Sequence, residues 1–260
     1  MIFVAAGTQD GRLLVEKLLK KDYKVTASVV SAYGKMLLTQ HKNLTINDNP
    51  LDEQALEKYL KANDIHVFLD ASHPYAVNMS KNAMEVCQKL LIPYIRYERQ
   101  ATRLLNYDKI HVVKSYEEAV KTAAALGKNI FLTTGSRNLK IFAEAAVLKE
   151  HFLTARVLPD ADVLILCTKL GFSPKNIIAL QGPFSTELNE ELYKKYKADV
   201  IVTKNSGTIG GTDTKLIAAR NLQLPVVLID RPKIKYTNIA ETIDNAICFI
   251  SEIEKNNGGI

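Results

Sequence analysis

Cysteine is scarce in this chain, with three residues among 260 and none of them in a C-x-x-C pair. Cys87, Cys167 and Cys248 lie far apart in the sequence, so they indicate neither a zinc site nor a redox pair. Each lies in an apolar stretch of helical character, and we expect each to be a buried free thiol. An odd and sparse set of this kind is typical of a reducing compartment.

Long hydrophobic runs are absent as well. No apolar segment approaches the roughly 18–20 residues that span a bilayer. Residues 1–6 reach Gly7 with no basic segment before them, which is unlike a secretory signal. We therefore expect a soluble, cytoplasmic protein with no membrane partner. A chain of 260 residues, 47% of them hydrophobic, suffices for one large α/β domain or two small ones.

A continuous block of Lys or Arg is also missing, although the formal net charge is +6. The basic residues are spread over predicted helix faces, as at Lys17, Lys20 and Lys21, and no aromatic RNA-binding signature accompanies them. We expect most of these charges to be solvated and expect no nucleic-acid partner. A positive balance still suits a polyanionic small molecule.

Short apolar runs alternate with amphipathic segments along the whole chain. Continuously apolar, β-branched runs are typical of parallel strands buried on both faces. Their alternation with helices predicts an α/β fold with parallel sheets. The expected strands are 2–6, 24–30, 66–71, 94–97, 111–113, 129–133, 176–181, 199–203 and 225–229. The expected helices are 11–21, 52–63, 77–91, 116–126, 161–170, 186–196, 214–221 and 239–254.

A domain boundary is expected near residues 100–108, where a charged cluster and a less regular stretch follow the strand 94–97. Two open sheets, formed by residues 1–100 and 101–260, would then face each other across a cleft. Ligands of parallel sheets bind outside the carboxyl ends of the strands. Functional side chains are therefore expected directly after strands.

The first such segment is Gly-Thr-Gln-Asp-Gly-Arg at residues 7–12, between the first strand and the first helix. Gly7 permits a tight turn, and the helix N-terminus with Thr8 and Arg12 would suit a phosphate. The spacing departs from the G-x-G-x-x-G fingerprint. An ordinary turn with Thr8 or Asp10 as the N-cap explains the segment equally well.

The end of the second strand lacks the carboxylate that holds the ribose 2′-hydroxyl in NAD-binding domains. Ser28, Ser31 and Lys35 stand there instead, which favours the 2′-phosphate of NADP.

The segment Ser72-His73-Pro74-Tyr75 follows the third strand. Ser72 could cap the next helix and touch a cofactor, and His73 could donate to a ligand or relay a proton. The alternative is a purely structural role, with Pro74 early in the helix and His73 satisfied locally.

Three segments of the second half occupy the same position after a strand. Thr134, Gly135, Ser136 and Arg137 resemble an anion cradle of backbone donors, hydroxyls and a guanidinium. Residues 181–185, Gln-Gly-Pro-Phe-Ser, form a rigid turn that Ser185 ends as an N-cap. The loop 204–215 carries three glycines and several hydroxyls between two lysines, an arrangement that can wrap a carboxylate or phosphate. A flexible surface turn is the alternative for this loop.

Zinc-ligand spacing, a nucleophile elbow and paired carboxylates are all missing, which argues against a hydrolase and a metal enzyme. Taken in order, the quoted segments resemble those of the precorrin-6A reductase family, including its cobalt-precorrin-6A branch. The matching stretches are 7–12, 70–76, 94–99, 133–136, 181–185, 204–215 and 231–232.

The resemblance implies two Rossmann-like parallel-sheet domains with the active site in the cleft between them. It also implies a step of cobalamin biosynthesis in which a hydride from NADPH or NADH reduces one double bond of the precorrin-6A macrocycle, or of its cobalt complex, to the 6B product. Carried over by position, the cofactor-binding residues are Gly7, Thr8, Arg12, Ser72, Tyr75, Thr134, Gly135, Ser136 and Arg137.

The substrate of this family carries acetate and propionate groups, which basic residues can bind. His73 and Lys204 are the candidate catalytic residues, as sources of the proton that accompanies the hydride, with water as the alternative. The candidates for holding the tetrapyrrole are Arg99, Lys204, Ser206, Gly207 and Lys215.

Two other functions fit the same glycine turns and basic loops. One is a nucleotide- or sugar-phosphate-binding protein without catalysis, and the other is a cofactor-free tetrapyrrole synthase on a similar scaffold. The ability to bind NADPH or NADH distinguishes the reductase from both.

Overall fold

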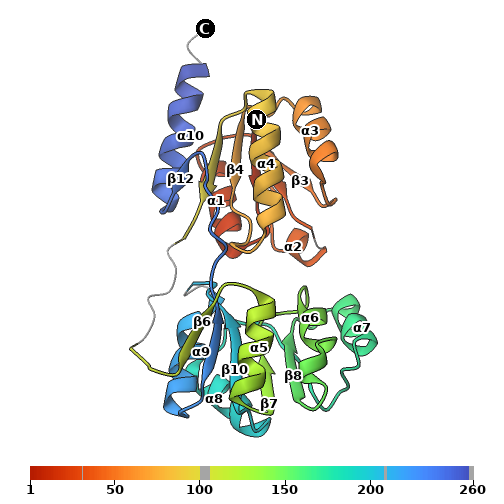
Figure 1. Cartoon of the computed structure of the whole chain (residues 1–260). Coiled ribbons are helices and arrows are strands. Elements are labelled where there is room, and N and C mark those ends of the chain that lie inside the picture. The colour runs from red at the N-terminus through yellow and green to blue at the C-terminus, as the bar shows by residue number, and fades with distance from the viewer. Residues whose placement is uncertain (31, 100–105, 208–209, 258–260) are drawn as a thin grey trace. The chain divides into compact units, whose positions relative to one another are not determined.

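Two parallel six-stranded sheets form the cores of the computed structural model, which describes residues 1–30, 32–99, 106–207 and 210–257 (Figure 1). The chain divides into two units. The first consists of Met1–Gln100 with Pro232–Ile260, and the second consists of Ala101–Arg231. The predicted α/β class with parallel sheets is confirmed.

The sheet of the first unit has the order β12-β5-β4-β1-β2-β3. Its strands are β1 (Ile2–Ala5), β2 (Val25–Ser28), β3 (Leu44–Asn47), β4 (Val67–Asp70), β5 (Tyr94–Tyr97) and β12 (Ile239–Ala240). Its helices are α1 (Gln9–Leu19), α2 (Ala32–Met36), α3 (Glu53–Ala62), α4 (Val77–Leu90) and α10 (Ile243–Asn257).

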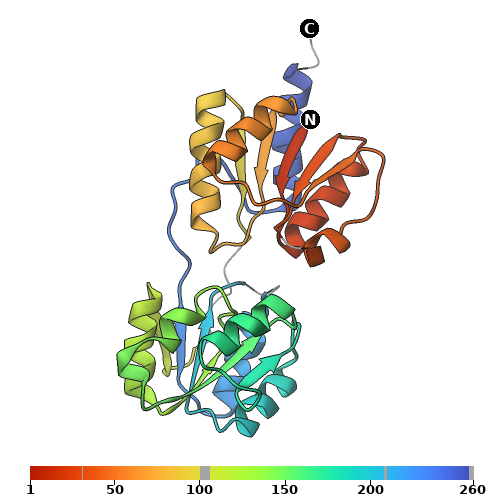
Figure 2. The same ribbon diagram turned by 90° about the vertical axis from the view of Figure 1, so that its right-hand side faces the viewer.

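Successive residues of β1 face opposite sides of this sheet, as strand geometry requires. Ile2 and Val4 pack with α1 and α10 in one core cluster. Phe3 and Ala5 pack with α3 and α4 in another. Figure 2 shows α3 and α4 on one side of the sheet and α1 on the other. Burial on both faces explains why the central strands are continuously apolar.

The sheet of the second unit has the order β6-β11-β10-β7-β8-β9. Its strands are β6 (Ile110–Val113), β7 (Asn129–Leu132), β8 (Phe152–Val157), β9 (Ile177–Ala179), β10 (Val200–Lys204) and β11 (Val226–Ile229). Its helices are α5 (Tyr116–Leu126), α6 (Leu139–Ala143), the 3-10 turn η1 (Ala146–Leu148), α7 (Ala161–Lys169), α8 (Thr186–Lys195) and α9 (Thr212–Asn221).

Both sheets have the doubly wound arrangement, in which the strand order reverses at one point inside the sheet. The reversal lies between β1 and β4 in the first unit and between β7 and β10 in the second. Ligands of such sheets bind at this switch point, beyond the carboxyl ends of the two strands. Each unit therefore has one edge at which functional side chains are expected.

Every predicted strand is present with small shifts at its ends, and three strands were missed: β3, β8 and β12. The β8 sequence includes Thr154 and Arg156, which are buried but polar, so it lacks the apolar signature of its neighbours. The predicted helix 239–254 begins at Ile243, because residues 239–240 pair with β5 as strand β12. The short helices α2 and α6 were also missed.

The predicted assignment of residues 101–260 to one domain is wrong in its last part. From Pro232 onward the chain returns to the first unit, where β12 pairs with Arg96 and Tyr97 of β5 and α10 packs on the same sheet. Residues 100–105, at the expected boundary, lie outside the described part of the chain. The cleft expected between the two domains stays a prediction.

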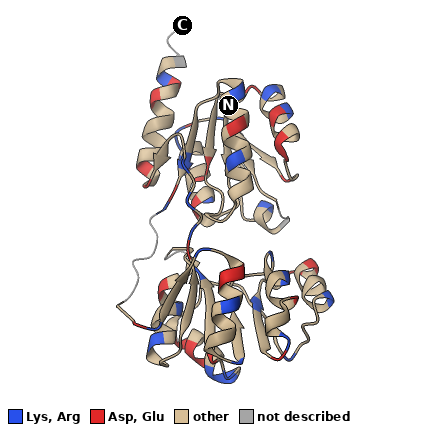
Figure 3. Cartoon of the chain, viewed as in Figure 1, with Lys and Arg blue, Asp and Glu red and all other residues tan. Residues whose placement is uncertain are grey.

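Two further expectations concern the surface. Cys87 and Cys167 are buried as predicted, but Cys248 is exposed, because α10 buries Ala246, Ile247 and Ile250 instead. Lys and Arg are interspersed with Asp and Glu along the helices of both units (Figure 3). Within the described residues, no helix combines the length and the apolar character needed to cross a membrane.

Candidate functional site

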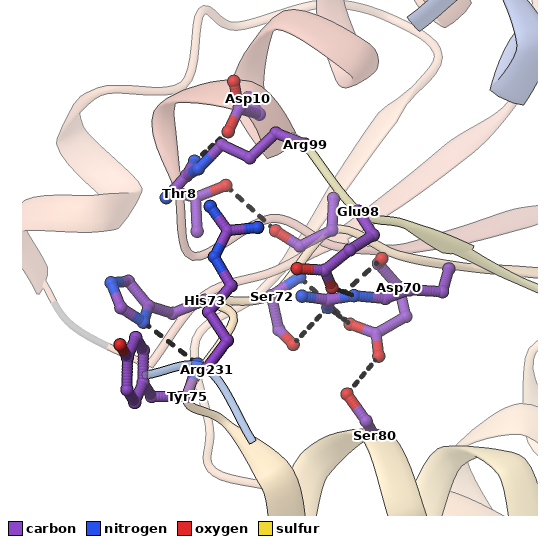
Figure 4. A network of polar contacts seen from close by, with 12 residues as sticks. Thr8, Asp10, Asp70, Ser72, His73, Tyr75, Ser80, Glu98, Arg99 and Arg231 are labelled. Atoms are coloured by element: carbon purple, nitrogen blue, oxygen red, sulfur yellow. Dashed lines mark hydrogen bonds and ion pairs between the residues drawn. The ribbon is translucent and has the colours of Figure 1, made fainter. Parts of the chain in front are cut away.

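Thr8 joins the two loops of the first switch point. Its hydroxyl accepts a hydrogen bond from the Gly11 N–H at 3.0 Å and donates one to the Ala71 carbonyl at 2.9 Å (Figure 4). Of the two N-caps considered for α1, Thr8 is therefore the one used. The same hydroxyl fastens the loop after β1 to the loop after β4, where the doubly wound fold places a ligand.

The two glycines of the first loop have different tasks. A Cβ on Gly11 would lie 2.7 Å from the Cα of Ala6, so the missing side chain lets α1 pack closely on the end of β1. A Cβ on Gly7 would meet nothing within 4 Å, and Gly7 is exposed. Arg12 follows in the first turns of α1 and is half-buried. Open space therefore lies at Gly7, at the start of the helix.

Asp10 and Arg99 form an ion pair that is largely buried (Figure 4). It connects the first turn of α1 to the segment after β5. Arg99 is one of the predicted substrate ligands, and in this structure its guanidinium is bound to Asp10. The pair places the positive charge of Arg99 at the same edge of the sheet as Thr8.

Asp70, the last residue of β4, is fully buried beneath this edge. Its carboxylate accepts hydrogen bonds from the backbone of Ser72 at 3.0 Å, from Ser80 at 2.6 Å, from Tyr94 at 2.8 Å and from Arg96 at 2.8 Å. Burial acts to raise the pKa of Asp70, but the Arg96 charge and these hydrogen bonds outweigh it and hold that pKa below its ordinary value. Asp70 is thus an ionised anchor for the Ser72 loop.

Ser72 is held by this network and does not cap α4. Its hydroxyl lies 3.0 Å from Nη1 of Arg96, which donates to it. The N-cap of α4 is Ala76, which has no side-chain cap, so the predicted capping by Ser72 is wrong. Since Nε of Arg96 also donates to Glu98 at 2.8 Å, the loop rests on a buried chain of charges.

His73 and Tyr75 are half-buried at the same edge. Nδ1 of His73 accepts from the backbone N–H of Tyr75 at 3.3 Å, and the two ring centroids are 5.6 Å apart (Figure 4). This bond leaves Nε2 as the nitrogen that carries the proton in the neutral ring. The local contact fits the structural role considered for His73 and is compatible with donation from Nε2.

Lys35 and Ser28, which were expected to bind the 2′-phosphate at the end of the second strand, already form hydrogen bonds within the protein. Lys35 donates to Asp48 at 2.7 Å, and Ser28 accepts from Asn47 at 3.1 Å. Ser31 lies outside the described residues. The preference for a 2′-phosphate therefore gains no support from Lys35 or Ser28.

The loop after β7 contains the predicted anion cradle. The Oγ1 atom of Thr134, whose residue is 3% exposed, has no hydrogen-bond partner in the described part of the chain. Gly135 adopts a φ of +77°, a conformation that favours glycine, and Ser136 and Arg137 follow it at the surface. The next helix, α6, has five residues, so the cradle depends on these groups and little on a helix dipole.

The loop after β10 is tied down by Thr212. Its hydroxyl accepts from the Ser206 N–H at 3.0 Å and donates to the Lys204 carbonyl at 3.1 Å. Gly207 has a φ of +82° and Gly211 a φ of +64°. Residues 208–209 lie outside the described part of the chain. The described part of this loop is an ordered turn in which side chains are bonded to the backbone.

Two lysines of this loop have strongly lowered pKa values. Burial lowers the pKa of Lys204 to about 8, and the charge of Arg137 adds to the effect. Burial lowers the pKa of Lys215 to about 7, with the charges of Arg156 and Lys204 acting in the same direction and Asp213 opposing them. Of the predicted residues, Arg137 is thus near enough to repel Lys204, and Lys204 is near enough to repel Lys215, at the second switch point.

Arg156 is a residue of this edge that the sequence analysis missed. It lies on β8, one of the missed strands, and is 5% exposed. The available signal was an arginine inside the otherwise strand-like run Phe-Leu-Thr-Ala-Arg-Val at residues 152–157.

The described residues contain no group of three or more His, Cys, Asp or Glu side chains arranged to hold a metal ion. Two switch-point edges remain as candidate ligand sites. The first offers open space at Gly7 beside a capped helix, and the second offers hydroxyls and repelling cations. Both sets suit anionic ligands.

Comparisons with known proteins agree on one group. Residues 1–251 match the protein family described as Precorrin-6x reductase CbiJ/CobK. The chain is 40% identical over 248 residues to a cobalt-precorrin-6A reductase of Priestia megaterium. The alignment covers 95% of this chain and 96% of that protein. It is 35% identical to a cobalt-precorrin-6A reductase of Methanocaldococcus jannaschii, with 97% and 99% of the two chains covered.

The fold has a solved counterpart. A structure named CobK precorrin-6A reductase superposes with a TM-score of 0.76 and covers 97% of this chain and 96% of its own. The sequence identity to it is 24%, so this likeness concerns the fold.

Proposed function

Because this chain belongs to the precorrin-6x reductase CbiJ/CobK family, we propose that it reduces one double bond in the macrocycle of precorrin-6A, or of its cobalt complex, to give the 6B product in cobalamin biosynthesis. The observation that carries the proposal is the family match over residues 1–251, together with relatives of 40% and 35% identity along nearly the whole chain. Both relatives are named cobalt-precorrin-6A reductase, so the cobalt complex is the substrate form that we favour.

The hydride donor in this proposal is NADPH or NADH. The first edge supports it, since Gly7 leaves open space before α1 and the N-terminus of that helix attracts a phosphate. Thr134, with its unpartnered hydroxyl, supports a ligand at the second edge. When bound, the nicotinamide supplies the hydride, and the chain's own residues hold it in place and exclude water. The residues proposed to contact it are Gly7, Thr8, Arg12, Ser72, Tyr75, Thr134, Gly135, Ser136 and Arg137.

The substrate in this proposal is an acidic tetrapyrrole. Its carboxylates would be bound by the cations Arg99, Lys204 and Lys215 and by the Ser206–Gly207 turn. The hydrogen bond from the Ser206 N–H to Thr212 supports a turn whose conformation is fixed before the ligand arrives.

A proton must join the macrocycle together with the hydride. Lys204, whose pKa lies at about 8, can hold a proton at neutral pH and release it without a large free-energy cost. His73, with Nε2 as the donor, is the other candidate. We propose that one of these two groups lies beside the carbon that receives the proton, and substitution of each by an isosteric neutral residue separates them.

The test is an anaerobic assay with both forms of the substrate and with NADPH and NADH, in which the absorbance of the macrocycle and of the nicotinamide is followed. For one substrate form and one cofactor, we expect one molecule of nicotinamide to be oxidised for each macrocycle that is reduced. Controls omit the protein, the substrate or the cofactor in turn. A protein that binds neither nicotinamide at millimolar concentration contradicts the reductase proposal and favours a cofactor-free function.

The cytoplasmic location expected above is part of the same proposal. Fractionation of the cells that produce the protein tests it.

A further inference from the structure

The described part of the second unit buries a guanidinium that has no carboxylate partner. Arg156 is 5% exposed, yet within the described residues no Asp or Glu forms an ion pair with it. In contrast, the comparably buried Arg96 of the first unit is paired with both Asp70 and Glu98. A buried charge without a counter-charge is costly, and proteins rarely keep one without a use.

Arg156 is nevertheless held in a defined orientation. Its Nη1 donates to Oδ1 of Asn189, a fully buried residue of α8, at 2.8 Å. Its guanidinium carbon lies 4.3 Å from the centroid of the Phe184 ring, in cation–π geometry. The Nη2 atom has no hydrogen-bond partner in the described part of the chain. One edge of the planar group is thus fixed, and another carries a buried N–H donor that has no partner within the described residues.

Arg156 lies near the start of α9, to which Asn189 connects it. The side chain of Asn189, which holds Arg156, also lies 3.5 Å from Oγ1 of Thr214 in the first turn of that helix. Nζ of Lys215, one residue further, folds back to the Gly210 carbonyl at 3.0 Å. Helix α9 has ten residues, so its N-terminus carries a positive dipole. The first N–H of the helix, that of Thr212, already donates to the Gly207 carbonyl at 3.3 Å.

The charges of this corner do not cancel. The pKa of Lys215 is lowered by burial and then by the charges of Arg156 and Lys204, which places both of these cations within range of Lys215. Asp213 acts in the opposite direction, as the one carboxylate among the groups that influence Lys215. Clusters of this kind relax when an anion binds, because it pairs with all the cations at once.

We propose that Arg156 and Lys215, together with the start of α9, form an anion subsite that takes a carboxylate or phosphate group of a ligand. The planar guanidinium fork suits both groups, which it binds through two parallel N–H bonds. The identity of the ligand rests on the proposed function: the group is either a peripheral carboxylate of the tetrapyrrole or a phosphate of the dinucleotide.

The experiment compares Arg156→Met, which keeps the length of the side chain and removes its charge, with Arg220→Met. Arg220 is an exposed arginine in the last turn of the same helix and lies outside the subsite, so it serves as the matched control. Calorimetry gives the Kd of NADPH and NADH, and anaerobic kinetics give the KM of the tetrapyrrole. Circular dichroism and the thermal midpoint establish that each variant is folded.

Loss of a charged hydrogen bond weakens binding by about 10- to 100-fold. A rise of this size in the Kd of the dinucleotide, with an unchanged tetrapyrrole KM, assigns the subsite to a cofactor phosphate. The converse result assigns it to a substrate carboxylate. Arg156→Lys should recover part of the affinity, because it keeps the charge without the fork. If both constants of the folded Arg156→Met protein stay within twofold of those of the Arg220→Met control, the subsite does not exist.

Failure of the proposed function gives a different result. If the wild-type protein reduces no tetrapyrrole and binds no dinucleotide, inorganic pyrophosphate is used as the probe. Binding of pyrophosphate to the wild type and Arg220→Met but not to Arg156→Met upholds the subsite without the reductase activity. Equal pyrophosphate binding by all three proteins overturns the subsite.

Discussion

At the scale of single residues, Gly7 and Gly11 differ in whether the fold leaves room for a side chain. A Cβ on Gly11 would lie 2.7 Å from the backbone of Ala6, whereas one on Gly7 would meet nothing within 4 Å. A backbone atom cannot move aside as the end of a side chain can. The requirement for glycine at position 11 is therefore steric, whereas the fold itself leaves room for a side chain at position 7, where the proposed function places a dinucleotide.

Gly11→Ala is expected to lower the free energy of unfolding by about 1–3 kcal/mol, the usual cost of overpacking. Gly7→Ala is expected to change it by less than about 0.5 kcal/mol, as for an exposed position, and to weaken dinucleotide binding. Urea denaturation and nicotinamide titration of both variants check this pair of expectations. Equal stability loss in the two variants would contradict the assignment of different tasks.

Lys215 predicts a pH dependence of anion binding. Its pKa of about 7 means that it is protonated below that pH and neutral above it in the folded protein. Anion affinity should therefore fall as the pH rises through about 7, with Arg156 staying charged and Lys204 adding a second fall near its own pKa of about 8. Lys215→Arg, which does not titrate in this range, should lose the first fall and keep the second. Calorimetry with NADPH or pyrophosphate on both sides of this pH checks it, and an unchanged pH profile in Lys215→Arg would exclude Lys215 from the subsite.

At the scale of elements, β12 is the edge strand of the first sheet and α10 packs on that sheet, although both follow the whole second unit in sequence. Ile250 of α10 is fully buried against this sheet, whereas Ile239 of β12 is 53% exposed. The apolar face of α10 is thus part of the core of the first unit. Its packing should stabilise strands β1, β4 and β5, whose residues lie in the same cluster.

Ile250→Ala is expected to destabilise the first unit by about 2–5 kcal/mol, as for a buried aliphatic side chain. Ile239→Ala, the exposed control, is expected to cost less than about 1 kcal/mol. Hydrogen exchange resolved by segment is the measurement, with faster exchange expected in the first sheet and unchanged exchange in the second. Faster exchange confined to β6–β11 would contradict the assignment of α10 to the first unit.

At the scale of the whole molecule, the second unit is an insertion between β5 and β12 of the first. Its six strands all come from residues 101–231, so its sheet is complete without the rest of the chain. Residues 1–100 lack β12 and α10, and the face that α10 covers would be exposed to water.

Residues 101–231 produced alone are expected to unfold cooperatively in urea, because they retain their own core. Residues 1–100 alone are expected to show no cooperative transition, and a fusion of 1–100 to 232–260 through a short Gly-Ser linker should restore one. Circular dichroism across a urea series checks the three proteins. A cooperative transition in residues 1–100 equal to that of the fusion would show that the C-terminal segment is dispensable.

The α/β class, the predicted strands and the placement of candidate residues after strands were determined by the sequence alone. Each depends on local patterns, since a continuously apolar strand and a helix start capped by Thr8 or Asp10 are visible within a few residues. The structure chose Thr8 between these two caps. The same holds for the resemblance that the family match later confirmed.

The tertiary structure alone decided which distant segments become neighbours. Arg96 meets Asp70, and this pairing removes Ser72 from its expected cap. Residues 232–257 return to the first sheet, and Arg156 is buried beside α8 with no ion pair to a carboxylate in the part of the chain that the structure describes. These outcomes depend on strand order and on the free energy of burying charges together, which no short stretch of sequence encodes.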